Sequence, residues 1–164
     1  MATARPAGSK VVFLDDSLTQ LDLPKDALWT DRYFRTGPAH LPLENDAYGT
    51  TTLRARGEGL KPYAPVHLRA RSVDGDLRLD WIRRTRVPGD GWGEVDVPLG
   101  EVRERYRVRV TDAGGTLVWE SDTGEPTAVV PGAVLARIAG GGARVSVAQL
   151  SEDVGPGPAA VLAI

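Results

Sequence analysis

Apolar and polar residues alternate with a period of two through the second half of the chain. In PVHLRAR (65–71), Val66, Leu68 and Ala70 alternate with His67, Arg69 and Arg71. In LRLDW (77–81), Leu77, Leu79 and Trp81 alternate with Arg78 and Asp80. A period of two is the period of a β-strand, whose successive side chains point to opposite faces. The sequence therefore predicts two strands, joined at residues 74–76 by a hairpin turn in which Gly75 can take a positive φ.

The clearest alternation lies in RERYRVRV (103–110). Tyr106, Val108 and Val110 are predicted on the inward face, with arginines on the outward face. Further strands are predicted in TLVWES after the DAGG turn at 112–115, in ARVSVAQLS from residue 143, and in the closing GPGPAAVLAI. Roughly seven short strands separated by turn signals are typical of an Ig-like β-sandwich. Its expected core comprises Trp81, Tyr106, Val108, Val110, Leu77 and Leu79.

The first sixty residues follow a different pattern. KVVFLDD (10–16) and LTQLDLP (18–24) are predicted as two strands of a β-hairpin around the turn Asp15-Asp16-Ser17. A third strand is predicted in residues 28–38, ending at the breaker Gly37-Pro38, and residues 41–63 are polar, turn-rich and expected to be extended. So few residues of this kind seldom hold a core of their own. We therefore expect two parts: a β-rich appendage in residues 1–61 that packs on the sandwich or on a partner chain, and the sandwich in residues 62–164.

Composition narrows the class of protein. The chain has 164 residues, of which 41% are hydrophobic and 26% charged, enough for one ordinary soluble domain with an appended piece. Its 19 glycines and 12 prolines favour short strands over long helices. The net charge of −2 argues against a nucleic-acid partner, and no apolar run is long enough for membrane insertion. There is no cysteine, and Asp74, Asp76 and Asp80 lack the spacing of a calcium loop, so we expect neither a metal site nor a cofactor.

Two features suggest a binding or assembly surface. The arginine stripe of Arg105, Arg107 and Arg109 fits either a phosphate-binding ridge or a solvated outer face. The nearby acidic residues and the negative net charge favour the solvated face. Trp92 stands between two glycines in a Gly/Pro-rich loop, where a core position is not expected, and a loop aromatic can anchor a protein partner or stack on a sugar. Trp92, Arg105, Arg107 and Arg109 nevertheless remain the candidate binding or assembly surface.

One stretch, VVFLDDSLTQ (11–20), resembles the Gly-Asp-Ser-Leu nucleophile block of SGNH-type esterases, with Asp15 in place of the glycine. A nucleophilic serine needs a histidine base oriented by a carboxylate, and in these enzymes an Asp-x-x-His block supplies both. The chain has two histidines, His40 and His67, and the residues three positions before them are glycine and alanine. We therefore interpret Ser17 as a turn residue and expect no enzyme.

Residues 62–164 resemble a fibronectin type III domain. LRLDW, with Trp81, is similar to the second strand of that family, and RYRVRV, with Tyr106 inward, is similar to its third. VSVAQLSEDVGPGP (145–158) is similar to the penultimate strand and the turn that follows. The chain departs from the family where Ala143 or Arg144 replaces a core tyrosine, and where one extra residue precedes Gly155. The resemblance implies a module that binds or spaces and carries no catalytic machinery.

A narrower resemblance covers nearly the whole chain. Residues 60–92, the later VAQLSEDVGPGP (147–158) and the upstream YFRTGPA (33–39) resemble the C-terminal end of the large tail-tip protein of gene transfer agents and related siphophages, also described as a host specificity or baseplate protein. The string SWIRRTR is typical of that family, and this chain has DWIRRTR at 80–86.

The tail-tip resemblance implies a structural component that docks on the tail hub and supports host attachment. Its partners would be other tail-tip or hub proteins in a threefold assembly, and it would be made in the bacterial cytoplasm and reside in the virion tail tip. The chain would be either a separately encoded terminal piece or a fragment of the longer protein. The alternative function is recognition of a host-surface glycan or receptor through loop aromatics.

Overall fold

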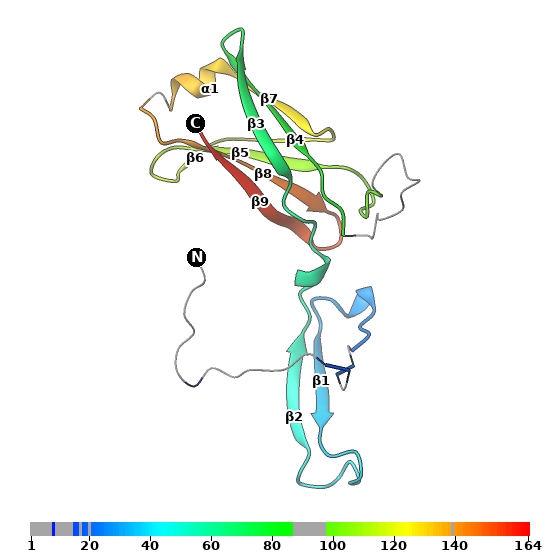
Figure 1. The fold of residues 1–164 in the computed structure, drawn as a ribbon. Coiled ribbons are helices and arrows are strands. Elements are labelled where there is room, and N and C mark those ends of the chain that lie inside the picture. Colours follow the sequence, from blue (N-terminus) through cyan, green and yellow to red (C-terminus); the bar gives the residue numbers. More distant parts are fainter. Residues whose placement is uncertain (1–7, 9–14, 17, 20, 87–97, 139) are drawn as a thin grey trace. The chain divides into compact units, whose positions relative to one another are not determined.

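The computed structural model describes residues 8, 15, 16, 18, 19, 21–86, 98–138 and 140–164. The chain divides into two compact units, Met1–Ala55 and Arg56–Ile164, which are described separately (Figure 1). This division falls six residues before the boundary expected after residue 61.

The second unit is a β-sandwich of two antiparallel sheets. The smaller sheet has the order β3-β4-β7, formed by Val66–Val73, Asp76–Ile82 and Thr127–Val130. The larger has the order β6-β5-β8-β9, formed by Leu117–Thr123, Tyr106–Thr111, Arg144–Ser151 and Gly155–Ala163. The only helices described in this unit are the 3-10 turn η2 (Glu58–Leu60) and α1 (Gly132–Ala136). The predicted all-β, fibronectin type III-like sandwich is confirmed.

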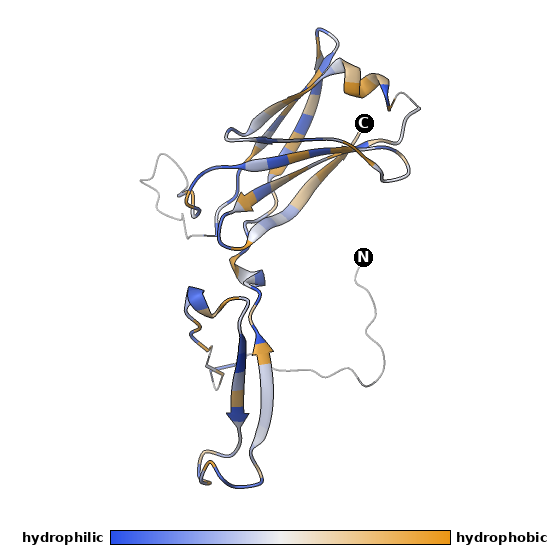
Figure 2. Ribbon diagram, turned by 180° about the vertical axis from the view of Figure 1, so that it is seen from behind, coloured by the Kyte–Doolittle hydropathy of each residue, from blue (hydrophilic) through white to orange (hydrophobic). Residues whose placement is uncertain are grey.

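The core lies between the two sheets. Leu79, Trp81, Tyr106, Val108 and Val110 are buried there, and Leu77 is partly buried against them. Val130 of β7, Val134 of α1, and Val145 and Val147 of β8 complete this core. Along β5 and β8, buried residues alternate with more exposed ones, and Figure 2 shows the matching alternation of hydrophobic and hydrophilic bands. The rings of Trp81 and Tyr106 meet edge to face, with centroids 5.1 Å apart, a favoured arrangement for aromatic pairs.

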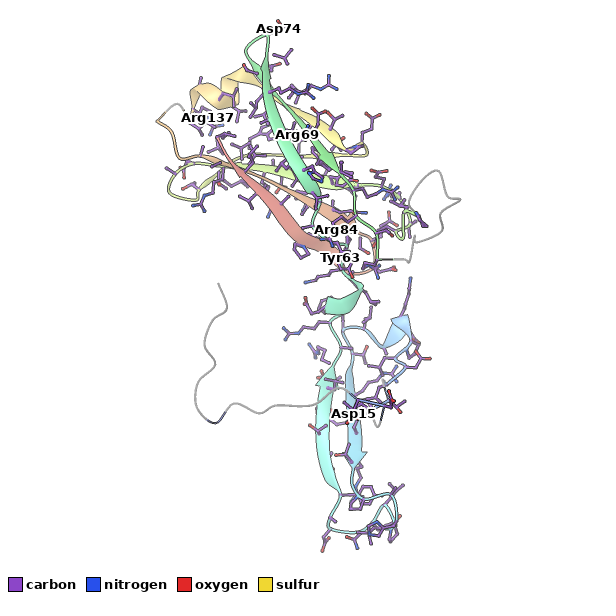
Figure 3. All side chains as sticks on the ribbon, viewed as in Figure 1. Asp15, Tyr63, Arg69, Asp74, Arg84 and Arg137 are labelled. Carbon is purple, nitrogen blue, oxygen red and sulfur yellow. The ribbon has the colours of Figure 1, made fainter. Side chains whose placement is uncertain are left out.

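The turn between β3 and β4 is the one that the sequence predicts. Val73 pairs with Asp76, so the loop has two residues, Asp74 and Gly75, with φ values of 51° and 87°. Positive φ at both central positions matches the right-handed twist of the flanking strands. Asp74 marks the tip of this hairpin in Figure 3. Next to the turn, the Asp76 carboxylate accepts a hydrogen bond of 2.7 Å from the backbone N–H of Gly132, which ties the hairpin to the start of α1.

In the described residues of the first unit, β1 (Asp31–Thr36) and β2 (Gly49–Arg54) form a hairpin, and the 3-10 turn η1 (Lys25–Ala27) precedes it. The strand predicted in residues 28–38 is β1. Its partner β2 comes from residues 41–63, which are expected to be turn-rich and extended. Thr50, Thr51 and Thr52 are β-branched residues suited to a strand.

The hairpin predicted in residues 10–24 is wrong in its second half. The Leu18 N–H donates to the Asp15 carbonyl at 3.1 Å, a hydrogen bond of the kind that closes a turn. However, the described residues of 18–24 are not in a strand. LTQLDLP carries three leucines but no β-branched residue except Thr19, and Pro24 interrupts it before η1. The first half of the predicted hairpin, and Ser17, lie outside the described residues.

Candidate functional site

The arginine stripe lies on the outer face of the four-stranded sheet, beside the carboxylates of β6. Arg107 makes two hydrogen bonds to Asp122, at 2.9 Å from Nε and 3.0 Å from Nη2. Arg105 Nη2 reaches the same carboxylate at 2.8 Å, and Arg109 Nε pairs with Glu120. These contacts follow from the register, which pairs Arg107 with Asp122 and Arg109 with Glu120 across the two strands.

The pKa shifts express this mutual neutralisation. The hydrogen bond from Arg107 is the main cause that lowers the pKa of Asp122, and Arg105 adds to it. The same bond raises the pKa of Arg107. The three guanidinium groups are thus already paired with two carboxylates of the neighbouring strand, and such cross-strand pairs of opposite charge stabilise a sheet. The stripe fits a solvated ion-pair ladder better than a ridge that waits for phosphate.

Replacing Arg105, Arg107 and Arg109 with serine should leave the sandwich folded. Each exposed or half-exposed pair contributes only about 0.2–1 kcal/mol, and none of the three side chains belongs to the core. Chemical unfolding of the triple variant measures the cost. An insoluble product, or a loss far above the sum of three such pairs, would contradict the assignment of this face to solvent.

The same variant should lose part of its acid sensitivity. Because the pKa of Asp122 lies below its usual value of 3.8, its contribution is present above that value and is lost as the pH falls through the folded pKa. Without the arginines this contribution is absent at every pH. The free energy of unfolding should therefore fall less steeply in the triple variant than in the wild type between about pH 4 and pH 2.

Of the two tryptophans singled out in the sequence, the structure describes Trp81 but not Trp92. Trp92, the candidate loop anchor, lies outside the described residues. Trp81 is buried against Tyr106, whose hydroxyl donates to the Glu104 carboxylate at 2.6 Å. Burial is the largest cause that raises the pKa of Tyr106, and the Glu104 carboxylate adds to it. This pair therefore forms part of the core and is not a binding site.

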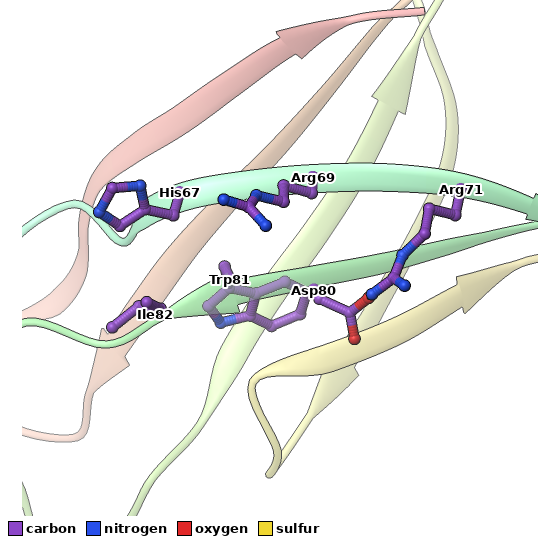
Figure 4. Close-up of a pocket in the computed structure, with 6 residues that line it drawn as sticks. All are labelled: His67, Arg69, Arg71, Asp80, Trp81 and Ile82. Carbon is purple, nitrogen blue, oxygen red and sulfur yellow. The ribbon is translucent and has the colours of Figure 1, made fainter.

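A second cationic surface lies on the outward side of β3 and β4. A depression of about 280 Å³ is lined by His67, Arg69, Arg71, Asp80, Trp81 and Ile82. Figure 4 shows His67, Arg69 and Arg71 in a row along β3, with Asp80 across from Arg71. The alternation in PVHLRAR predicts that His67, Arg69 and Arg71 share one face of the strand, but it does not predict a site there.

The charges on this surface are incompletely balanced. Asp80 supplies the carboxylate among the residues that line the depression. Its oxygens lie 3.1 Å from Arg71 Nη2 and 3.6 Å from Arg78 Nε. Burial would raise the pKa of Asp80, but the hydrogen bond from Arg71 and the charges of Arg78 and Arg71 together hold it below its usual value. Among the described residues, no carboxylate lies within ion-pair distance of Arg69. The face of β3 therefore keeps a positive charge available to a partner.

The backbone at His67 is unusual. Its φ is 53°, in the left-handed region, and the register between β3 and β4 shifts between Val66 and Arg69. Such a bulge inserts an extra residue, bends the strand and breaks its regular edge. An edge strand interrupted in this way is a poor template for pairing with another chain.

The catalytic alternatives gain no support from the described residues. His40 lies in the first unit and His67 in the second, and Ser17 is not described. In the described ranges, no three His, Asp or Glu side chains gather as a metal site would require. None of the helices described is long and apolar enough to cross a membrane.

The β1–β2 hairpin of the first unit is almost entirely exposed. Of its strand residues only Phe34 is partly buried, and the Tyr33 side chain is 77% exposed. The hairpin is nevertheless well specified: Arg54 makes two hydrogen bonds to Asp31, at 2.6 Å and 2.9 Å. At the other end the Tyr48 hydroxyl lies 2.9 Å from the Pro38 carbonyl, which closes the long loop between the strands.

No protein-family model matches this chain. No curated protein matches it either. Among solved structures it is similar to domains d3–d4 of the rat CD45 extracellular region, with 10% identity and a TM-score of 0.43 over 99% of this chain and 78% of that one. It is also similar to an endonuclease/exonuclease/phosphatase from Beutenbergia cavernae, with 14% identity and a TM-score of 0.34 over 80% of this chain and 35% of that one. Neither similarity carries functional information.

Proposed function

We propose that this chain is a non-catalytic structural component of a phage or gene-transfer-agent tail tip, which docks on the tail hub and supports host attachment. The proposal starts from the sequence resemblance, above all DWIRRTR at 80–86. The single structural observation in its favour is the exposed β1–β2 hairpin, which joins a sandwich that has a core of its own.

An exposed two-stranded hairpin is expected to be stabilised by contact with a partner. A hairpin of this kind is marginally stable alone in water, and needs a third strand or a packed face to persist. Each strand of β1–β2 pairs only with the other among the described residues, so each has a free edge. Free edges and exposed apolar side chains are the features through which strands join other chains. We infer that the hairpin is the docking element and that the sandwich is the module it attaches.

The partners under this proposal are the tail-tip and hub proteins, arranged with threefold symmetry, and the location is the virion. Direct recognition of a host glycan through loop aromatics would depend on Trp92, which is outside the described residues. The assembly role is therefore the better supported of the two.

The test places a charge on the hairpin of the full chain. Tyr33→Asp and Leu53→Asp change exposed positions on β1 and β2, so the fold should remain while docking is lost. Val129→Asp changes a position on β7 of the sandwich that is 52% exposed, between Leu53 at 43% and Tyr33 at 77%, and is the matched control. Tails purified from producing cells should carry the wild-type chain and the control, but not the double variant.

Two results would contradict the proposal. One is purified tails that lack even the wild-type chain. The other is a double variant recovered in the same amount as the control. Thermal unfolding of the three purified chains verifies that a loss from the particle does not come from a loss of folding.

A further inference from the structure

Strand β9 forms an exposed edge of the four-stranded sheet, because among the described residues it pairs only with β8. Its first half contains Pro156 and Pro158, but residues 159–163 are Ala-Ala-Val-Leu-Ala, without proline or charge. The Val161 side chain is 61% exposed. Natural edge strands are usually protected by prolines, charges or bulges, so this half of β9 is open to pairing with another strand.

In this half of β9, every second residue directs its backbone N–H and C=O groups away from β8. The Ile164 N–H donates to the Ala143 carbonyl at 2.9 Å, toward β8. In an antiparallel ladder the direction of the N–H and C=O groups alternates from residue to residue. Ala159, Val161 and Ala163 therefore direct their N–H and C=O groups away from β8, toward the open edge.

A groove runs beside this edge, between β9 and β3. It has a volume of about 740 Å³, and its floor is formed by the apolar side chains of Leu68, Ala70, Leu77, Leu162 and Ile164. A second depression of about 260 Å³ shares Leu77 and Ile164 with it and adds Leu135 and Ile138. The groove therefore offers a continuous apolar surface to a segment that pairs with β9.

The rim of the groove is cationic. Arg69 and Arg71 line it from β3, and Figure 3 shows Arg69 on that strand. Arg71 is shared with Asp80, and Arg69 has no carboxylate partner among the described residues. An incoming strand thus meets apolar side chains in the floor and positive charge at the rim, which selects a partner that presents apolar and acidic side chains on the same face.

A second copy of the chain fits this edge poorly. Pairing β9 with β9 of another copy would also bring the two β3 strands together, because β3 packs beside β9. Arg69 and Arg71 of one copy would then approach the same arginines of the other, and like charges at an interface oppose association. The charge of the rim favours an acidic partner over self-association.

We propose that residues 159–163 of β9 bind an extended segment of another protein by strand addition, with apolar and acidic side chains of that segment facing the groove between β9 and β3. Main-chain hydrogen bonds would supply affinity and the side-chain contacts would supply selectivity. This interaction involves the sandwich alone, so it stands or falls separately from the hairpin docking proposed above.

The test uses the full chain and a blocked synthetic peptide, Thr-Val-Thr-Glu-Thr-Glu-Thr-Val-Thr, whose valines and glutamates share one face of a strand. Binding is measured by calorimetry, and amide exchange reports the site. The peptide should bind and should slow exchange at Ala159, Val161 and Ala163. The same peptide with glutamine in place of glutamate should bind about tenfold more weakly, and with lysine it should not bind.

Variants of the chain identify the contacts. Val161→Pro removes an outward N–H at a position where an edge strand tolerates proline, and should abolish binding while the melting temperature shows that the sandwich is folded. Val161→Thr keeps the N–H and should retain binding. Arg69→Gln with Arg71→Gln should remove the preference for glutamate over glutamine. Arg109→Gln, two strands from β9 on the outer face of the same sheet and not part of the groove lining, should leave it unchanged.

The proposal is overturned if the glutamate peptide does not bind, or if bound peptide protects amides elsewhere but not in residues 159–163. It is also overturned if sedimentation shows that the wild-type chain dimerises and that Val161→Pro makes it monomeric, since β9 would then serve a second copy.

Discussion

Trp81→Ala is expected to lower the free energy of unfolding of the sandwich by about 3–5 kcal/mol, the usual cost of truncating a large buried aromatic side chain. Trp81 is only 4% exposed, and its ring packs edge to face on Tyr106 in the centre of the core. Its loss removes buried apolar area, leaves a cavity between the sheets and deprives Tyr106 of its aromatic partner. Urea unfolding of the full chain, followed by circular dichroism, measures the effect.

Trp29→Ala is the matched control, because the same side chain is removed from a position that is 52% exposed in the other unit. It should leave the unfolding of the sandwich unchanged within about 0.5 kcal/mol. If Trp81→Ala unfolded at the same urea concentration as this control, the packing of β4 against β5 would be wrong.

Gly157→Ala should also be strongly destabilising, by about 1–3 kcal/mol or more, as overpacking of a rigid site is. A Cβ at Gly157 would overlap the carbonyl oxygen of Pro62, a backbone atom that cannot turn aside as a side chain can. The start of β9 or the segment before β3 must therefore move. Gly59→Ala is the control within the same unit, since nothing lies within 4 Å of its Cβ position and its φ is not positive. Equal stability of the two variants would show that Pro62 does not lie against β9.

The sandwich was predictable where the alternation is long. Strands β3, β4, β5 and β8 show a period of two over at least five residues, and the Asp74-Gly75 turn fixes one register. Strand β7 was not predicted because Thr127–Val130 is too short to show a period. It is defined instead by tertiary contacts: pairing with β4, and the hydrogen bond of 2.9 Å from the Thr127 hydroxyl to the Leu79 carbonyl. The five-residue helix α1 was likewise beyond a periodicity argument.

In the first unit, the local sequence pattern did not predict which strands pair. Residues 18–24 are predicted to pair with residues 10–16, and no partner is predicted for the strand in residues 28–38. The observed partner of that strand, β1, is β2, which is reached through a long loop. The contacts that stabilise this loop join its two ends: Tyr48, directly before β2, packs on Gly37, directly after β1, where a Cβ would overlap its ring. The Tyr48 hydroxyl also donates to the Pro38 carbonyl. Such contacts depend on tertiary placement, which propensity does not give.

The candidate surfaces could be predicted only in part. The sequence places Arg105, Arg107 and Arg109 on one face, but their neutralisation by Glu120 and Asp122 depends on the register of β5 with β6. The alternation also places Arg69 and Arg71 outward, whereas their position at the rim of a groove depends on β9, almost a hundred residues later. The open half of β9 is visible in the sequence as AAVLA, once it is known to be an edge.

The central claim is that the β1–β2 hairpin is a docking element, which a partner in the tail tip completes, beside a sandwich that is stable alone. Amide hydrogen exchange on the full chain, free and in purified tail tips, tests it most directly, because exchange measures the cost of opening each element. In the free chain, β5 and β8 should exchange slowly and β1 and β2 rapidly, and in the tail tip β1 and β2 should become protected. Protection of β1 and β2 in the free chain equal to that of β5 and β8, with no change in the particle, would contradict the account.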